Sequence, residues 1–269
     1  MVKLKLKNFD LAHICESGQC FRMTQPEVNK YEIIATDKFL KAEQYDDECI
    51  FYCDEDEFEN FWRHYFDLDT DYQQFKDAVD EEDEYLNAAV KLGSGIRILN
   101  QDLWEMIVSF LISQQNNITR IRRCINNISE KYGEKKTVED GTIYYAFPKP
   151  EAFIGLPEDA LMECNLGYRS KYVVRTAKMV VEGEISLEAI KNMDYKEAKE
   201  ELLKLYGVGK KVADCICLFA LHNLEAFPID THINQALNAN YPEGFPFELY
   251  EGFEGVIQQY IFFYELFGK

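Results

Sequence analysis

The chain has few features of an exported or membrane-embedded protein. No apolar run approaches the about 18 to 20 residues that a membrane-spanning helix needs. The first residues, MVKLKLKNFDLAHIC, hold no long apolar core followed by a small-residue cleavage site. No internal repeat or low-complexity segment is visible. We therefore expect a globular cytoplasmic protein, nucleoid-associated if its source is prokaryotic, with no membrane partner.

Positive charge is scarce. The chain has 29 Lys and Arg against 48 Asp and Glu, a formal net charge of -19. Such a surface repels polyanions at long range and disfavours non-specific binding to nucleic acid. The charge is unevenly spread, since acidic runs occupy 46–48, 54–57 and 81–84, whereas basic residues gather in 120–123, 169–171 and 204–211. This distribution is compatible with one basic face.

A disulfide framework is not expected, because a chain without an export signal meets a reducing environment that keeps its eight cysteines as thiols. Cys15, Cys20, Cys49 and Cys53 are the candidate zinc ligands, but both pairs lie in segments that resemble half-buried strands. The last cysteine is Cys217, so no four-cysteine iron-sulfur cluster follows near the C-terminus. We expect no metal and no cofactor.

The patterning predicts an α+β fold. The segments YEIIATDKFLKAE and CIFYC, within residues 11–53, are rich in β-branched and aromatic residues and predict a small antiparallel sheet. Glycines at 93 and 95 form the clearest flexible break, so we place an N-terminal mixed domain at 1–94 and a helical domain at 95–269. Helical periodicity in the second part predicts an all-α bundle from DLWEMIVSFLISQQNN, TRIRRCINNISEKYG, KYVVRTAKMVVEG, YKEAKEELLKLYG, KVADCICLFALHN and FEGVIQQYIFFYELFG.

The most specific motif is a helix-hairpin-helix near 196–222, where an amphipathic helix, the turn Gly207-Val-Gly209 and an apolar helix follow one another. Two glycines let the backbone approach a phosphate closely, and the exposed N–H groups that begin the second helix bind an anion without reading sequence. The same turn is also a common way of joining two packed helices.

A second motif, Phe227-Pro-Ile-Asp230-Thr-His232, places an acid just after a proline. Asp230 is suited to cap a helix that begins at Thr231, and a capping role alone would account for it. Lys211 and Asp230 together, however, resemble the signature of the helix-hairpin-helix, Gly/Pro-rich, aspartate DNA glycosylases.

This resemblance implies that Lys211 is a nucleophile and Asp230 its partner. Lys211 would attack the anomeric carbon of a flipped nucleotide, form a Schiff base and cleave the strand by β-elimination, and Asp230 would stabilise positive charge on the sugar. The attack requires a neutral amine, so we expect burial to lower the pKa of Lys211. Cys215 lies one helical turn further and would contact the amine or the damaged base, unless it is only a small buried hydrophobe.

Further segments resemble the 8-oxoguanine DNA glycosylases in particular. In Ser17-Gly18-Gln-Cys-Phe-Arg22, the Gly18 carbonyl would accept the ring N–H that oxidised guanine has and guanine lacks. In the helix at 255–262, Gln258 would bond the Watson–Crick edge of the flipped base and Phe262 would stack on it, although an aromatic residue at this spacing is also typical of a core.

The resemblance also implies a grip on DNA. Gln115 would fill the gap left by the extruded base and Tyr168 would wedge into the stack. Arg120 and Arg169 would bond the orphaned cytosine, and His232 would contact a phosphate. The hairpin residues Gly207, Gly209 and Val212 would bind the DNA backbone. Two positions depart from the family pattern: Tyr206 replaces the usual proline of the hairpin, and Gln115 replaces the asparagine common in the 8-oxoguanine branch.

The resulting hypothesis is a monomeric base-excision glycosylase with lyase activity at apurinic or apyrimidinic sites, acting on double-stranded DNA that contains oxidised guanine. A monofunctional alkylbase glycosylase, which needs no lysine nucleophile, is one alternative. A non-catalytic helix-hairpin-helix module that binds DNA or a protein is the other, and the net charge of -19 favours it.

Overall fold

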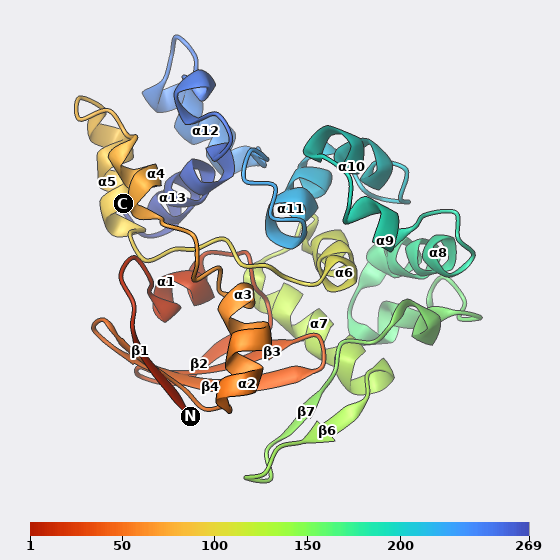
Figure 1. Cartoon of the computed structure of the whole chain (residues 1–269). Coiled ribbons are helices and arrows are strands. Elements are labelled where there is room, and N and C mark those ends of the chain that lie inside the picture. Colours follow the sequence, from red (N-terminus) through yellow and green to blue (C-terminus); the bar gives the residue numbers. More distant parts are fainter. Residues whose placement is uncertain (269) are drawn as a thin grey trace.

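The computed structural model describes residues 1–268 and contains an N-terminal sheet followed by a larger helical part, as predicted (Figure 1). The sheet has five antiparallel strands in the order β1-β5-β4-β3-β2. Their bounds are β1 Val2–Lys5, β2 Met23–Glu27, β3 Lys30–Ala35, β4 Lys38–Tyr45 and β5 Glu48–Phe51.

One face of this sheet is apolar because its strands alternate. Tyr31 and Ile33 are buried on β3, and in the ladder they pair with Ala42 and Leu40 of β4. These side chains pack under a helical segment that crosses the sheet and carries the fully buried Trp62. The segment consists of α2 (Glu55–Glu57), a π-helical turn (Phe58–Trp62) and α3 (Arg63–Tyr65).

Within residues 1–268, the helical part contains the six helices that the periodicity predicts and four further α-helices. The first group is α4 (Gln73–Asp77), α5 (Glu84–Leu92), α6 (Leu103–Ser113), α7 (Ile118–Tyr132) and α8 (Ser170–Val181). The second is α9 (Leu187–Ile190), α10 (Tyr195–Leu202), α11 (Lys210–Ala220), α12 (Thr231–Asn240) and α13 (Glu254–Phe267). Within residues 1–268, no helix has both the length and the apolar character needed to cross a membrane.

Helix α6 is the centre of the helical part, because every residue from Leu103 to Ile112 is buried. Such a helix must be surrounded on all sides. Its buried acid, Glu105, faces the sheet: the carboxylate accepts a hydrogen bond from the Thr36 backbone N–H at 3.0 Å and lies 3.6 Å from the guanidinium of Arg22. Burial raises the pKa of Glu105 to about 7, against the opposing charge of Arg22.

Several elements differ from or extend the predicted ones. The strand β1 forms although the sheet was expected to begin only after residue 11; the alternation in VKLKLK is the signal for it. Helix α1 (Leu11–Glu16) lies inside the segment expected to be strands. The helical part is not purely α, since β6 (Lys135–Thr137) and β7 (Ile143–Tyr145) form a projecting hairpin (Figure 1). Its turn contains Asp140 and Gly141, and Gly141 has a φ of 87°, which glycine adopts readily.

The buried apolar side chains form two hydrophobic clusters. The domain boundary between residues 94 and 95 stays a prediction. One cluster contains the sheet, α1 and the crossing helical segment, and its members run from Phe9 to Phe66 with the addition of Leu99. The other contains the helical part and already includes Tyr72, Phe75 and Leu86. Helices α4 and α5 thus share a core with the C-terminal helices, and α5 lies beside α13 (Figure 1).

Arg97 joins the two parts of the chain. Its guanidinium, only 5% exposed, donates to the carbonyls of Asn8 at 3.1 Å and Thr70 at 3.0 Å and also to that of Asp67. It lies 4.5 Å from the ring centre of Tyr72. These bonds fix the extended segment at 93–102 between α5 and α6.

We expect Arg97→Met to lower the free energy of unfolding by about 2 to 4 kcal/mol, because buried carbonyls lose a charged donor. Urea denaturation followed by circular dichroism measures this change. Arg123→Met is the matched control, since Arg123 is exposed on α7 and its replacement should stay within about 0.5 kcal/mol. Equal effects of the two substitutions would contradict the role assigned to Arg97.

Candidate active site

Lys211 is the second residue of α11, the second helix of the predicted hairpin. The preceding helix α10 ends at Leu202, and Gly209 caps α11 without a side-chain hydrogen bond. The first N–H groups of α11 therefore remain available to an anion. Lys210 is exposed, whereas Lys211 is half-buried.

The hairpin turn depends on close approach of α8. Gly207 has a φ of 93°, and a β-carbon there would lie 2.7 Å from the ring of Tyr172. Tyr206, which replaces the usual proline, packs edge-on against the Tyr172 ring at 5.5 Å and under the guanidinium of Arg175 at 4.3 Å. Side-chain packing thus holds the turn where the family pattern has a proline.

Asp230 caps α12, which confirms the predicted capping role. Its carboxylate accepts a hydrogen bond from the Ile233 backbone N–H at 2.9 Å, and its backbone is extended. The side chain is only half-buried, and it lines the same cavities as Lys211. The Asp230 carboxylate therefore both caps α12 and lies close to the Lys211 amine.

Two adjoining cavities meet at Lys211, Asp230 and His232. The first, of about 470 Å³, is also lined by Gly18, Phe110 and Phe262. The second, of about 580 Å³, is lined by Gln115, Arg120 and Val212. The structure thus gathers predicted catalytic, base-binding and DNA-binding residues from five separate parts of the chain around these two cavities.

The electrostatics of Lys211 differ from the prediction. Burial acts to lower the pKa of the amine, but the sulfur of Cys215, which is hydrogen-bonded to it, and the carboxylate of Asp230 act to raise it. The balance lies above the ordinary value of 10.5, so the predicted lowering is wrong for the DNA-free protein. Burial also raises the pKa of the Cys215 thiol. Lys211 is therefore an ammonium at neutral pH until a proton is removed.

Gly18 stands at the turn that leaves α1 and lines the first cavity. Its φ is 75°, and a β-carbon there would lie 3.0 Å from the ring of Phe262. Both the backbone conformation and the close contact favour glycine. Phe262 belongs to α13. The two predicted base-binding residues therefore lie next to each other in the lining of the first cavity.

Gln258 is placed differently from its predicted role. It is 4% exposed, its amide donates to the carbonyl of Pro228 at 3.1 Å, and its oxygen accepts from Gln259 at 3.0 Å. Both ends of the side chain are thus used within the protein, where they brace the segment before Asp230. Contact between Gln258 and a base stays a prediction, and it requires these bonds to be exchanged.

Some residues predicted to contact DNA line the second cavity, and others lie beside them. Gln115 has a φ of 50°, and its side chain accepts a hydrogen bond from the Tyr168 hydroxyl at 3.4 Å. Tyr168 is 47% exposed and stacks on Arg169. Arg120 and His232 are exposed.

Arg169 is only 3% exposed, whereas a residue that contacts a base would be expected to be accessible. Its guanidinium donates to the carbonyls of Gln114 and Gln115 and so holds their loop. The loop is also tied to the hairpin, because the Gln114 amide donates to the Gly207 carbonyl at 3.0 Å. Contact of Arg169 with an orphaned cytosine stays a prediction.

Sequence reasoning missed Phe110, whose ring centre lies 5.7 Å from the Lys211 ammonium. It belongs to the continuous apolar run of α6, where no pattern separates a cavity wall from the core. Asn116 and Asn117 also line both cavities, and Asn117 caps α7. Their place in the polar segment SQQNN was the available signal.

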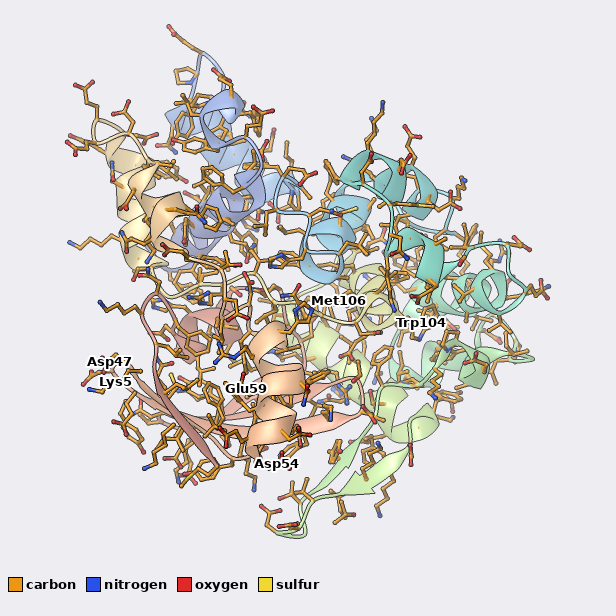
Figure 2. The ribbon with its side chains drawn as sticks, in the orientation of Figure 1. Lys5, Asp47, Asp54, Glu59, Trp104 and Met106 are labelled. Atoms are coloured by element: carbon orange, nitrogen blue, oxygen red, sulfur yellow. The ribbon has the colours of Figure 1, made fainter. Side chains whose placement is uncertain are left out.

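The acidic run at 54–57 lies apart from this site. Figure 2 labels Asp54 and Glu59 on the helical segment that crosses the sheet, away from α11 and α12.

The cysteines are unpaired thiols. Over residues 1–268, no three His, Cys, Asp or Glu side chains are grouped closely enough to hold a metal ion.

The sequence matches two known protein families, one after the other along the chain. Residues 1–107 match the family described as 8-oxoguanine DNA glycosylase, N-terminal domain, and residues 108–242 match the HhH-GPD superfamily base excision DNA repair proteins. The chain therefore belongs to the HhH-GPD superfamily of base excision DNA repair proteins, in the branch that carries the 8-oxoguanine DNA glycosylase N-terminal domain.

Individual relatives agree with this placement. The N-glycosylase/DNA lyase of Saccharomyces cerevisiae is 33% identical over 259 residues, which cover 86% of this chain and 68% of the yeast protein. The structure of MBOgg1 with a low affinity DNA ligand has a TM-score of 0.92 and 34% identity, covering 98% of this chain and 94% of that one. The 8-oxoguanine glycosylase/lyase of Clostridium acetobutylicum with double-stranded DNA has a TM-score of 0.89 and 40% identity, covering 96% and 92%.

The contact between Cys215 and Lys211 predicts a measurable change in titration. In Cys215→Ala the sulfur no longer raises the pKa of Lys211, whereas burial still lowers it, so the pKa should fall relative to the unsubstituted protein. Nuclear magnetic resonance of lysine labelled at its ε-carbon follows this titration in the DNA-free protein. Cys217→Ala is the control, because that buried thiol faces Lys199 and Asp214 instead. An unchanged Lys211 titration in Cys215→Ala would show that the sulfur does not control the amine.

Proposed function

We propose that this protein is a bifunctional DNA glycosylase and lyase that removes 8-oxoguanine from duplex DNA. The observation that carries the proposal is the single cavity lined by Lys211, Asp230, Gly18 and Phe262. An amine beside a carboxylate supplies chemistry at a sugar, and the two remaining residues supply a slot for a flat base. The relatives named N-glycosylase/DNA lyase and 8-oxoguanine glycosylase/lyase support the same activity.

The first chemical step joins Lys211 to the sugar. After the ammonium loses a proton, its nitrogen forms a bond to the anomeric carbon, and the bond from that carbon to the base nitrogen breaks with the electron pair leaving on the base. Positive charge develops on the sugar as the base departs. The Asp230 carboxylate, held in place by the Ile233 N–H, stabilises that charge without having to reorganise.

Strand cleavage follows from the covalent intermediate. The sugar ring opens to give a protonated imine between Lys211 and the former anomeric carbon. The imine acidifies the adjacent carbon; loss of a proton there expels the 3′ phosphate, and hydrolysis of the imine later releases the enzyme. This sequence distinguishes the proposed enzyme from a monofunctional alkylbase glycosylase, which lacks the covalent step.

Base selection is assigned to Gly18. Its carbonyl would accept the ring N–H of 8-oxoguanine, whereas guanine presents an acceptor at the same place and leaves the carbonyl unsatisfied, at a cost of about 1 to 3 kcal/mol. Phe262 packs against Gly18 and would stack on the base. The Clostridium acetobutylicum relative was solved with DNA carrying cytosine opposite 8-oxoG, which supports this substrate.

DNA binding is assigned to the hairpin and to the loop at 113–117. Backbone N–H groups at Gly207 and Gly209 would hold a phosphate, while Gln115 and Tyr168 would enter the stack. All of these residues come from one chain, so we propose that the protein acts as a monomer.

Replacing the two catalytic groups tests the proposal. On a duplex with 8-oxoguanine opposite cytosine, borohydride should trap a covalent adduct with the unsubstituted protein and none with Lys211→Gln. Asp230→Asn retains a cap for α12 but loses the charge, so base release should slow by about 100- to 1,000-fold while the fold remains. Gel electrophoresis of the trapped adduct and of the cleaved strand measures both.

Lys210→Gln is the matched control for Lys211→Gln, since it removes the exposed neighbouring amine and should leave trapping intact. Base release without an adduct in the unsubstituted protein would instead favour a monofunctional glycosylase. Binding with neither reaction would favour a non-catalytic module.

Gly207→Ala should weaken binding to damaged and undamaged duplexes by a similar factor, of about tenfold or more. Its φ is positive and the new β-carbon would meet the Tyr172 ring, which displaces the phosphate-binding turn. Fluorescence anisotropy at a fixed salt concentration measures both affinities. Gly183→Ala carries a similar backbone strain, with a φ of 76° and open space around it, and should leave both affinities unchanged. Loss of selectivity alone would argue against a backbone contact.

A further inference from the structure

Gly18 must be held at a fixed place relative to Lys211 if it is to read a base attached to the sugar that Lys211 attacks. This requirement rests on the proposed function. The two residues belong to different parts of the fold, since Gly18 follows α1 and Lys211 begins α11. The structure contains a chain of buried hydrogen bonds that connects them.

The first link is Gln19, which directly follows Gly18 and is fully buried. Its amide donates to the Ser17 hydroxyl at 2.9 Å and to the Arg97 carbonyl at 2.8 Å, and its side-chain oxygen accepts from the Leu99 N–H at 2.9 Å. The side chain thus bonds the residue before Gly18 and the segment between α5 and α6. A glutamine used in this way leaves the turn little freedom.

The second link is Gln101, which is 7% exposed. Its amide donates to the backbone carbonyl of Gln19 at 2.9 Å and, more weakly, to that of Phe219 at 3.4 Å. Its own backbone N–H also donates to the Phe219 carbonyl, at 3.3 Å. Phe219 lies in the last turn of α11, the helix that begins with the nucleophile.

We propose that Gln19 and Gln101 are positioning residues that set the selectivity for the oxidised base by fixing Gly18 relative to helix α11. Neither side chain lines the cavity that holds Gly18 and Lys211. They act through the backbone of Gly18, whose carbonyl discriminates between bases only while it stays within hydrogen-bonding distance of the ring nitrogen. A loosened turn weakens reading of the base and leaves the amine in place.

Gln101→Met tests this proposal, because methionine has a similar length and volume but donates no hydrogen bond. Two substrates are compared under single-turnover conditions: a duplex with 8-oxoguanine opposite cytosine, and the same duplex with an abasic site, which presents no base to be read. We expect excision of 8-oxoguanine to slow by about 10- to 100-fold, whereas cleavage at the abasic site stays within about threefold.

Gln44→Met is the matched control. Gln44 is 9% exposed and bonds the other end of α1, accepting from the Leu11 N–H at 2.7 Å and donating to the Phe9 carbonyl at 2.9 Å. It destabilises the same helix without contacting residues 17–19, so both reactions should keep their ratio. Gln19→Met provides a second variant of the network with the same expected divergence between substrates.

A parallel loss of both reactions in Gln101→Met, or no change in either, overturns the proposal and leaves the network a purely structural feature. The same change of ratio in Gln44→Met overturns it as well. Failure of the proposed function looks different: the unsubstituted protein would then fail to excise 8-oxoguanine, whatever the variants do.

Discussion

The site depends on where Lys211 sits on its helix. The first turn of α11 carries partial positive charge and its unpaired N–H groups suit a phosphate, but the same charge disfavours an ammonium. Burial disfavours it too. Cys215, one turn further along the helix, and Asp230, across the cavity, restore the charged form in the free protein. The amine is therefore held between two opposing influences, and an event that removes the effect of the sulfur or of the carboxylate lowers its pKa.

The sheet contributes to this site although it carries no catalytic group. Glu105 of the buried helix α6 bonds the sheet at Thr36 and pairs with Arg22, which follows the Gly18 turn by a few residues. Arg97 fixes the segment that receives Gln19. Polar side chains buried between the two parts thus determine where the glycine turn lies. Buried polar groups are costly unless satisfied, so such a junction adopts one arrangement in preference to many.

Local chemistry explains which features the sequence predicts. Gly207, Gly209 and Asp230 have short-range roles in a turn and a cap, and these appear where the motifs place them. The direction of the Lys211 pKa shift could not be read in advance, because it is a balance among burial, a sulfur and a distant carboxylate. Arg169 and Gln258 are buried and have hydrogen-bond partners inside the protein, which only tertiary packing decides. Phe110 was hidden within an apolar helix, and β6 and β7 are too short to show periodicity.

The cavity walls come from both ends of the chain and from its middle: Gly18, Phe110, Lys211, Asp230 and Phe262. No short fragment contains them, and the contacts that unite them are of high sequence separation, so closing them costs chain entropy. A nascent or partly unfolded chain can expose the hairpin and still lack a reactive centre. For a protein whose proposed chemistry breaks DNA strands, the reactive centre is thus a property of the whole tertiary structure and not of the hairpin motif alone.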